Sequence, residues 1–164
     1  MISIIAAVGK NNELGKNNGL IWNIPKDLKF FREKTLGSTI IMGRNTFNSL
    51  PKVLPKRLHV VLSDSDDFNK ELTENVIVVH SMEELTEVCH KLGKGKEIFV
   101  VGGASVYRMF IDIADKLYIT HIEAEDKEAD VYFPEIDSSK WRKKVLAKDE
   151  DNNIKFSHVE YTKI

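Results

Sequence analysis

Apolar residues along this chain gather in short runs that are separated by polar, glycine-rich connections. The first run, 2–8, is almost continuously apolar and ends at Gly9, as expected of a strand buried on both faces of a sheet. Runs of the same kind predict further strands, in order along the chain, at 39–42, 58–62, 76–79, 98–101 and 117–122. Such continuous runs are the pattern of a mostly parallel sheet.

Helical spacing occupies segments between these runs. Pro25 and Asp27 mark a helix start, and Ile24, Leu28 and Phe31 recur at the spacing of one helical face. A second helix follows the capping-box sequence 81–84, and its apolar face is formed by Met82, Leu85, Cys89 and Leu92. A short helix follows the glycine pair 102–103 and extends through Phe110.

The pattern changes near the end of the chain. Segments 141–147 and 154–161 flank the polar stretch 149–153, which predicts a β-hairpin. Alternating strands and helices followed by a hairpin predict an α/β fold with a mostly parallel sheet and antiparallel strands at its end. The length of 164 residues fits a single domain over residues 1–164.

Composition narrows the classes of function. The net charge is −1, so no basic field indicates nucleic acid or an acidic membrane surface as a partner. Cys89 is the one cysteine, which excludes an internal disulfide and favours a reducing, cytoplasmic location. The apolar start lacks a basic region and a cleavage site, so we expect a strand there and not a signal peptide, and no apolar run approaches membrane-spanning length.

Two strand ends carry the pattern of a phosphate site. The run 98–101 leads into glycines 102–103 and a helix, where backbone approaches a ligand closely and the helix N-terminus offers N–H groups. The run 39–42 leads into Gly43 and Arg44 at another helix start. Taken alone, these motifs also fit an unliganded turn and a solvated surface arginine. Together they favour a dinucleotide with several phosphates.

Asp27 is the residue that the sequence marks most clearly as a candidate for a catalytic or ligand-binding role. It lies in a first helical turn at the edge of an apolar face, with Leu28 beside it and Phe31 one turn on. Burial would raise its pKa and the helix N-terminus would lower it. A buried carboxylate needs a cationic partner, which a flat amidine-like heterocycle supplies. A solvated carboxylate that favours the helix dipole is the other interpretation.

Several chemistries are excluded by spacing. Segment 9–17 imitates a phosphate-binding P-loop, but one residue too many precedes its Gly-Lys pair and Asn17 stands where Ser or Thr is required. No histidine pair has zinc-ligand spacing, so we expect no metal site. Cys89 lies on an apolar helix face and is expected in the core, and no Gly-x-Ser-x-Gly nucleophile motif is present.

The order of motifs closely resembles the bacterial dihydrofolate reductase family over nearly the whole chain. The resemblance is carried by Ile5-Ala6-Ala7, Leu14-Gly15, 22–28, Phe31, 41–46, 54–57, 101–103, Tyr107, 117–120 and Phe133-Pro134. It favours the functional interpretation of Asp27, Arg44 and Gly102. It implies a single α/β domain with an eight-stranded, mostly parallel mixed sheet, about four flanking helices, a C-terminal antiparallel hairpin and a cleft across the sheet.

The resemblance also implies an activity. Such an enzyme is an NADPH-dependent oxidoreductase that transfers hydride to C6 of 7,8-dihydrofolate with protonation of N5, forming the tetrahydrofolate of one-carbon metabolism and of thymidylate and purine synthesis. Asp27 would hold the pteridine and act at a distance, with Trp22 ordering the ring edge and a water admitted beside Leu20. The long segment 9–24 would be the mobile loop that closes over nicotinamide. Diaminopyrimidine or pteridine antifolates would be inhibitors, and the protein would be a monomer.

The family's binding residues map onto this chain position by position. The catalytic residues would be Asp27, Trp22 and Leu20. The substrate would contact Ile5, Ala6, Asp27, Leu28, Phe31, Leu50, Lys52, Leu54, Arg57, Val101, Tyr107 and Thr120. NADPH would contact Ala7, Leu14, Gly15, Asn18, Gly19, Leu20, Gly43, Arg44, Asn45, Thr46, Leu62, Ser63, Asp64, His80, Val101, Gly102, Gly103, Ala104, Ser105, Val106 and Tyr107. Arg57 would grip the α-carboxylate of the substrate through its guanidinium fork.

Some positions depart from the family's usual residues. Ile21 and Thr39 replace common prolines, and Lys52-Val53 replaces Arg-Pro. Asp64 and Ser105 stand where hydroxyl and basic residues often hold the cofactor phosphates, so Asp64 would repel a 2′-phosphate. We therefore expect weaker discrimination against NADH.

Two other functions compete with this interpretation. A related pteridine or pyrimidine reductase could use the same sheet, although Arg57 favours a substrate with a carboxylate tail. A non-catalytic folate- or nucleotide-binding protein could also retain the fold. The presence of Asp27, Trp22 and Thr120 disfavours that alternative.

Overall fold

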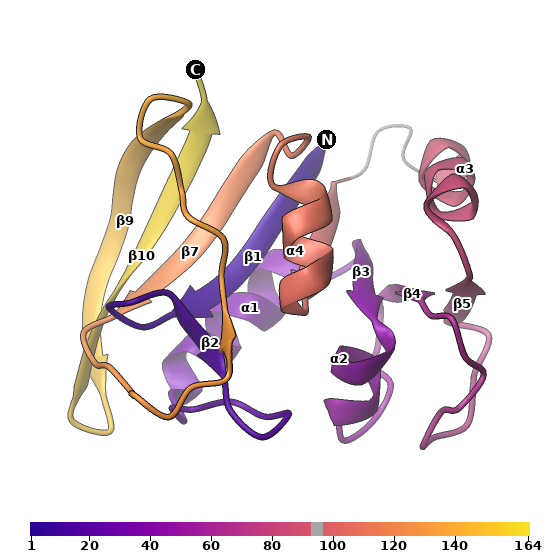
Figure 1. The fold of residues 1–164 in the computed structure, drawn as a ribbon, viewed down its shortest axis with the longest axis horizontal. Helices are drawn as coiled ribbons and strands as arrows, with labels where there is room; N and C mark the ends of the chain where they lie inside the picture. Colours follow the sequence, from indigo (N-terminus) through magenta and orange to yellow (C-terminus); the bar gives the residue numbers. More distant parts are fainter. Residues whose placement is uncertain (93–96) are drawn as a thin grey trace.

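One eight-stranded sheet runs through the molecule in the computed structural model, which describes residues 1–92 and 97–164 (Figure 1). The strand order is β5-β4-β3-β6-β1-β7-β10-β9. Neighbours from β5 to β7 are parallel, whereas β10 is antiparallel to both β7 and β9. The strands are β1 Ile2–Val8, β3 Thr39–Gly43, β4 Leu58–Leu62, β5 Val76–Val79, β6 Ile98–Gly102, β7 Lys116–Ile122, β9 Trp141–Asp151 and β10 Ile154–Lys163. The predicted fold class is confirmed.

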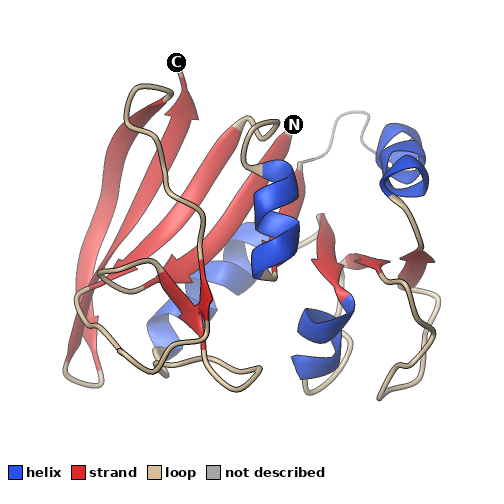
Figure 2. Cartoon of the chain, in the orientation of Figure 1, coloured by secondary structure: helices blue, strands red, loops and turns tan. Residues whose placement is uncertain are grey.

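Four helices in the described residues flank this sheet (Figure 2). They are α1 Pro25–Thr35, α2 Arg44–Ser49, α3 Met82–Leu92 and α4 Ala104–Phe110. α1 and α2 pack Phe31 and Phe47 into one apolar cluster, and α3 and α4 pack Leu85 and Phe110 into another. In Figure 1, α4 lies in front of β1 and α1 lies behind the sheet. The sheet is therefore covered on both faces, as its continuous apolar runs require.

The alternation of side chains along β1 divides the core between these two faces. Ile4, Ala6 and Val8 belong to the cluster under α3 and α4, while Ile5 belongs to the cluster under α1 and α2. Cys89 is half-buried and packs against the first of these clusters, at the edge of the core and not within it as the sequence predicts.

The hairpin is longer than its sequence pattern predicts. β9 continues to Asp151 and β10 begins at Ile154, so the turn is reduced to Asn152 and Asn153, both with positive φ. Asparagine tolerates this left-handed conformation, which suits a two-residue hairpin turn. The stretch 149–151 is polar because the edge strand β9 is largely solvent-exposed, and not because it is a loop.

A second, small sheet has one strand in segment 9–24, which the sequence pattern predicts to be one long loop. β2 Glu13–Gly15 pairs antiparallel with β8 Val131–Tyr132. The Glu13 carboxylate is buried and accepts hydrogen bonds from the backbone N–H groups of Asn11 (2.6 Å) and Asp126 (2.8 Å). This carboxylate ties the start of the 9–24 segment to the chain beyond β7.

Two further features of the described residues bear on function. Within 1–92 and 97–164, no helix has the length and apolar character needed to cross a membrane. Over the same residues, no group of three or more histidine, cysteine, aspartate or glutamate side chains is arranged to hold a metal ion.

Candidate active site

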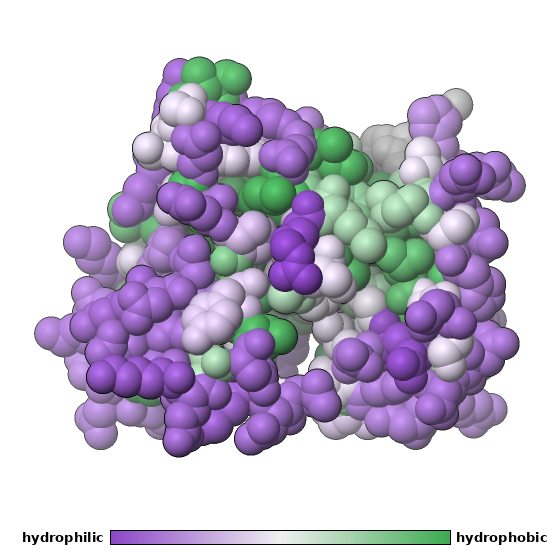
Figure 3. All heavy atoms as spheres, in the orientation of Figure 1, coloured by the Kyte–Doolittle hydropathy of each residue, from purple (hydrophilic) through white to green (hydrophobic). Residues whose placement is uncertain are grey.

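An open cleft of about 890 Å³ crosses the carboxyl ends of the central parallel strands. Ala7 near the end of β1, Gly43 at the end of β3 and Gly102 at the end of β6 all line it. In Figure 3 this face of the molecule is hollowed between its two halves. The carboxyl edge of a parallel sheet is where open α/β folds bind ligands.

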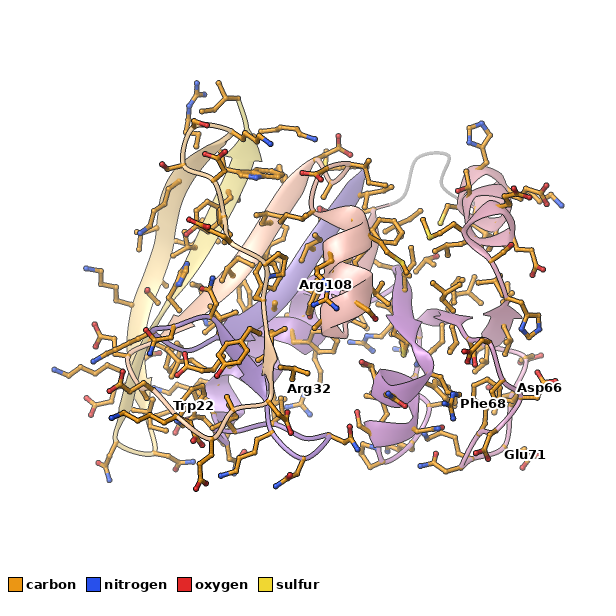
Figure 4. All side chains as sticks on the ribbon, viewed as in Figure 1. Trp22, Arg32, Asp66, Phe68, Glu71 and Arg108 are labelled. Carbon is orange, nitrogen blue, oxygen red and sulfur yellow. The ribbon has the colours of Figure 1, made fainter. Side chains whose placement is uncertain are left out.

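Every residue that we predicted to contact the cofactor lies on the wall of this cleft. They are Ala7, Leu14, Gly15, Asn18, Gly19, Leu20, Gly43, Arg44, Asn45, Thr46, Leu62, Ser63, Asp64, His80, Val101, Gly102, Gly103, Ala104, Ser105, Val106 and Tyr107. The structure thus brings together segments from seven parts of the fold, although contact with a cofactor stays a prediction. Arg108 and Met109 on α4 also line the cleft and were missed, although they follow Ser105 at the helical spacing of one face. Figure 4 shows Arg108 on α4.

The glycine pair between β6 and α4 is required by close backbone packing. Gly102 has φ of +138°, which L side chains rarely adopt. A Cβ built on Gly102 would lie 3.1 Å from Oγ1 of Thr46, and one on Gly103 would lie 3.3 Å from the same atom. The turn therefore presents bare backbone to the cleft, opposite the start of α2.

Near the start of α2 the cleft brings Arg44 together with two carboxylates, those of Asp64 and Asp67. Arg44 lies at the first position of α2, and its Nη1 is 3.9 Å from a carboxylate oxygen of Asp67. The Ser63 hydroxyl accepts a hydrogen bond from the backbone N–H of Ser65 at 3.1 Å and donates to the backbone carbonyl of the same residue. Asp64 is exposed on the same wall. An anionic group here would meet Arg44 together with the negative charge of Asp64.

Asp27 lies in the first turn of α1 and points its carboxylate back toward the sheet. The Thr120 hydroxyl on β7 donates a hydrogen bond of 2.6 Å to Oδ1 of Asp27. The Asp27 side chain is 21% exposed, and burial raises the pKa of the carboxyl, while the Thr120 hydrogen bond and nearby His158 oppose that rise. Among the two interpretations left open by the sequence, the structure favours the buried carboxylate.

His158 on β10 is a neighbour of this carboxylate that the sequence analysis missed. Its Nδ1 is 2.9 Å from Oγ1 of Thr120 and 3.8 Å from Oδ1 of Asp27. Thr120 and His158 are direct partners in the antiparallel register of β7 and β10. No local motif marks His158, because its proximity to Asp27 depends on that register across the sheet.

Apolar side chains form a wall next to Asp27. Ile5 is a buried member of one apolar cluster against which the half-buried Phe31, Leu50, Leu54 and Val101 pack. Leu28 is 41% exposed, so it does not complete a buried helical stripe as its spacing with Ile24 predicts. The reason is that α1 borders open space at this position. The Ala6 side chain points to the opposite face of the sheet from Ile5, so only its backbone faces this wall.

Arg57 is a buried cation held rigidly by its own segment. Its Nε donates to Oγ1 of Thr35 at 2.9 Å, and its two terminal nitrogens donate to the carbonyls of Pro55 and Arg32, each at 2.6 Å. Among the ion pairs of residues 1–92 and 97–164, none involves Arg57. Burial and the neighbouring Arg32 lower the pKa of the guanidinium. A guanidinium has further N–H donors beyond these three, so an anion would complete its hydrogen bonding.

The remaining predicted residues lie at the edges of the site. Leu20 lines the cleft and is 70% exposed, whereas Trp22 packs in a small cluster with Ile24 and Phe156. Figure 4 places Trp22 on the side of the molecule that holds β2 and the β9–β10 turn. The Tyr107 hydroxyl is buried and donates to the carbonyl of Ile5 at 2.8 Å. Lys52 is exposed between α2 and β4.

A parallel sheet with a cleft across its carboxyl edge, a glycine turn at the end of β6 and a buried carboxylate beside an apolar wall is typical of α/β oxidoreductases that bind a dinucleotide. The dihydrofolate reductase family profile matches residues 1–163. The chain therefore belongs to the dihydrofolate reductase family.

Individual relatives match this chain over nearly their whole lengths. The dihydrofolate reductase of Bacillus subtilis is 37% identical over 166 residues, covering 99% of this chain and 95% of that protein. That of Buchnera aphidicola is 37% identical over 157 residues, covering 93% and 91%. A solved structure of the Enterococcus faecalis enzyme, complexed with NADP(H) and RAB-propyl, superposes with a TM-score of 0.84 at 35% identity and covers 99% of this chain and 96% of that one. The resemblance stated from the sequence is confirmed.

Proposed function

We propose that this chain reduces 7,8-dihydrofolate to 5,6,7,8-tetrahydrofolate with NADPH. The proposal rests on the environment of the Asp27 carboxylate. This group accepts a hydrogen bond from Thr120, burial raises its pKa, and an apolar wall lies next to it. Membership of the dihydrofolate reductase family supports the same reaction. The product would supply one-carbon metabolism and the synthesis of thymidylate and purines.

The substrate would lie with its pteridine ring over the Ile5 wall and its polar edge on Asp27. The 2-amino group and ring N3 form an amidine-like pair of donors, which a carboxylate binds through two charge-assisted hydrogen bonds. The p-aminobenzoyl ring would contact Phe31, Leu50 and Leu54, and the α-carboxylate would reach Arg57. The α-carboxylate would accept hydrogen bonds from the guanidinium N–H groups that do not bond Thr35, Pro55 or Arg32.

The large cleft fits NADPH, because the Gly102 turn offers backbone without a Cβ and Arg44 offers a cation at a helix start. When bound, NADPH supplies hydride from C4 of its nicotinamide ring. Ala7, Gly15 and Leu20 line the same cleft. These residues would orient the nicotinamide ring and shield it from water. Closure of the exposed Leu20 segment would exclude bulk water from the reacting face.

Protonation of N5 would proceed without a side chain that reaches it. Asp27 binds the opposite edge of the ring, so it acts through orientation and its field, and a water admitted beside Leu20 delivers the proton. Trp22 packs behind the loop that carries Leu20, against Gly9, where an added Cβ would lie 2.5 Å from the indole. Trp22 would therefore hold the start of that loop.

We also propose that the protein works as a monomer in the cytoplasm and binds diaminopyrimidine or pteridine antifolates at Asp27. Such inhibitors carry the same amidine-like edge as the substrate. A monomer is supported by the edge strand β9, where exposed basic side chains such as Lys143 and Lys144 oppose strand pairing. Sedimentation equilibrium should give the 18.7 kDa mass of one chain, and a dimer mass would contradict it.

The test of the reaction is the loss of the near-ultraviolet absorbance of NADPH when dihydrofolate is added to the purified protein. We expect oxidation that depends on both ligands. The matched control is Asp27→Asn, which keeps the Thr120 hydroxyl partnered. Binding of both ligands without oxidation would contradict the proposal and favour a non-catalytic folate-binding protein.

A further inference from the structure

Three polar side chains from three elements form a buried chain behind the site. The Thr120 hydroxyl on β7 lies between Oδ1 of Asp27 on α1, at 2.6 Å, and Nδ1 of His158 on β10, at 2.9 Å. Thr120 is 2% exposed and His158 is 8% exposed. The carboxylate of Asp27 is therefore backed by a titratable group, and the proposed function gives that group no role.

Packing holds the His158 ring in one orientation. The ring stacks on Phe30 of α1 with centroids 3.9 Å apart and an interplanar angle of 12°, and it meets Phe156 edge-on at 5.2 Å. Its strand register sets it directly opposite Thr120. Because the ring is clamped by α1 on its face and by β10 at its edge, Nδ1 stays directed at the Thr120 hydroxyl.

The Thr120 hydroxyl has only one hydrogen, so it can donate to Asp27 or to His158 but not to both at once. When Thr120 donates to the ionised Asp27, it accepts from His158, so Nδ1 of that ring carries hydrogen. When Asp27 is protonated, the Thr120 hydroxyl can rotate and donate to Nδ1 instead. The protonation of Asp27 and the tautomer of His158 are thus linked through one rotor.

Other charges around His158 are few among the described residues. The negative charges that act on His158 are the carboxylates of Asp27 on α1 and Asp149 on β9. Asp149 also forms an ion pair of 3.0 Å with Lys26. Lys34 lies on the far side, 6.0 Å from the Phe30 ring centroid. Burial lowers the pKa of His158, while Asp27 and Asp149 partly raise it again. The charge closest to the imidazole is the carboxylate of Asp27, at 3.8 Å.

We propose that His158 is a positioning residue that keeps the Thr120 hydroxyl turned toward Asp27 and thereby favours the ionised carboxylate. The imidazole touches neither substrate nor cofactor in this account and acts only through Thr120. The inference rests on the proposed function for its effect on turnover, but its effect on Asp27 itself can be measured without any substrate.

Two substitutions separate the parts of this role. His158→Phe keeps an aromatic ring to stack on Phe30 but removes the Nδ1 donor and the positive charge available to imidazole. His158→Asn places an amide nitrogen near the position of Nδ1, so it keeps a donor to Thr120 and removes the charge together with the ring that stacks on Phe30. His121→Asn is the matched control, because His121 is also a half-buried histidine of this sheet, bonded to the Tyr161 hydroxyl.

The experiment is a titration of the Asp27 carboxyl by ¹³C NMR in protein labelled at aspartate, with Asp27→Asn used to assign the resonance. We expect the midpoint in His158→Phe to lie about half to one pH unit above that of the unmodified protein, which corresponds to one lost hydrogen bond. His158→Asn should fall between them, and its place divides the effect between hydrogen bond and charge. His121→Asn should not move the midpoint.

Equal midpoints in the unmodified protein and His158→Phe would overturn the inference. If His158→Phe does not fold, Thr120→Val becomes the deciding variant, because it removes the hydroxyl through which His158 acts. An Asp27 midpoint in Thr120→Val equal to that of the unmodified protein would then overturn the inference. A second measurement is the pH profile of kcat/KM for dihydrofolate, whose acid limb should move upward with the NMR midpoint. A shifted midpoint in a protein that does not oxidise NADPH would remove the proposed function and leave the role of His158 standing.

Discussion

At the scale of single residues, the site depends on charges that are buried before any ligand arrives. Asp27 and Arg57 are each held by neutral partners, a hydroxyl in one case and a hydroxyl with two carbonyls in the other. Neutral partners fix the position of a charge without neutralising it, so each remains available to an oppositely charged ligand.

The substitution Arg57→Lys should weaken recognition of the substrate tail. An ammonium cannot reproduce the fork that reaches Thr35, Pro55 and Arg32 while also binding a carboxylate. We expect kcat/KM for dihydrofolate to fall about 10²-fold, the equivalent of about 3 kcal/mol. A dihydropterin without a carboxylate tail is the control substrate and should be reduced as well as before. An equal loss for both substrates would remove the assignment of the tail to Arg57.

Asp64 should reduce the preference for NADPH over NADH. Its carboxylate shares the cleft wall with Arg44 and would lie near a 2′-phosphate. We expect Asp64→Ser to raise the ratio of kcat/KM for NADPH to that for NADH about tenfold, through one removed repulsion of about 1.4 kcal/mol. Glu71→Gln, an exposed change in the segment that follows β4, should leave the ratio unchanged. A constant ratio in Asp64→Ser would show that this carboxylate does not contact the phosphate.

At the scale of elements, sequence patterns predict what depends on neighbouring residues along the chain. Strands β1, β3, β6 and β7 are buried on both faces, so their apolar runs are nearly continuous and easy to recognise. β2 and β8 are only three and two residues long and pair with each other across more than 110 residues of sequence, so no local pattern marks them. His158 was missed for the same reason, since its role depends on the register between β7 and β10.

The turn between β6 and α4 gives a prediction about an element boundary. Gly102→Ala would add a Cβ at φ of +138° and 3.1 Å from Thr46, which we expect to cost about 1–3 kcal/mol of stability and to weaken NADPH binding. Gly37→Ala is the matched control, because Gly37 has φ of +77° with nothing within 4 Å of the added Cβ. Chemical denaturation and NADPH titration should show lost stability in both variants and lost binding only in Gly102→Ala. Retained binding in Gly102→Ala would contradict the role of the bare turn.

At the scale of the whole molecule, the site reduces the stability of the fold that carries it. Burial raises the pKa of Asp27 above its ordinary value of 3.8, so the ionised carboxylate destabilises the folded state at neutral pH. Below that ordinary value the carboxyl is protonated in both folded and unfolded chains, and the penalty disappears. A stability cost at a functional group is the usual trade-off between stability and activity.

The substitution Asp27→Asn should therefore stabilise the protein at neutral pH by on the order of 1 kcal/mol. The gain should shrink as the pH falls through the raised pKa of Asp27 toward 3.8. Asp137→Asn is a control of opposite sign, since hydrogen bonds from Ser139 lower the pKa of that exposed carboxylate. Thermal unfolding at several pH values measures both effects. A gain in Asp27→Asn that does not change with pH would contradict the electrostatic origin.

The central claim is that the Asp27 carboxylate anchors and polarises the substrate. The most direct test is kcat/KM for dihydrofolate in the unmodified protein and in Asp27→Asn across the pH range. We predict a loss of about 10²–10³-fold at neutral pH in the variant, with partial recovery in acid, where the substrate arrives already protonated. Unchanged turnover in Asp27→Asn at neutral pH would contradict the account.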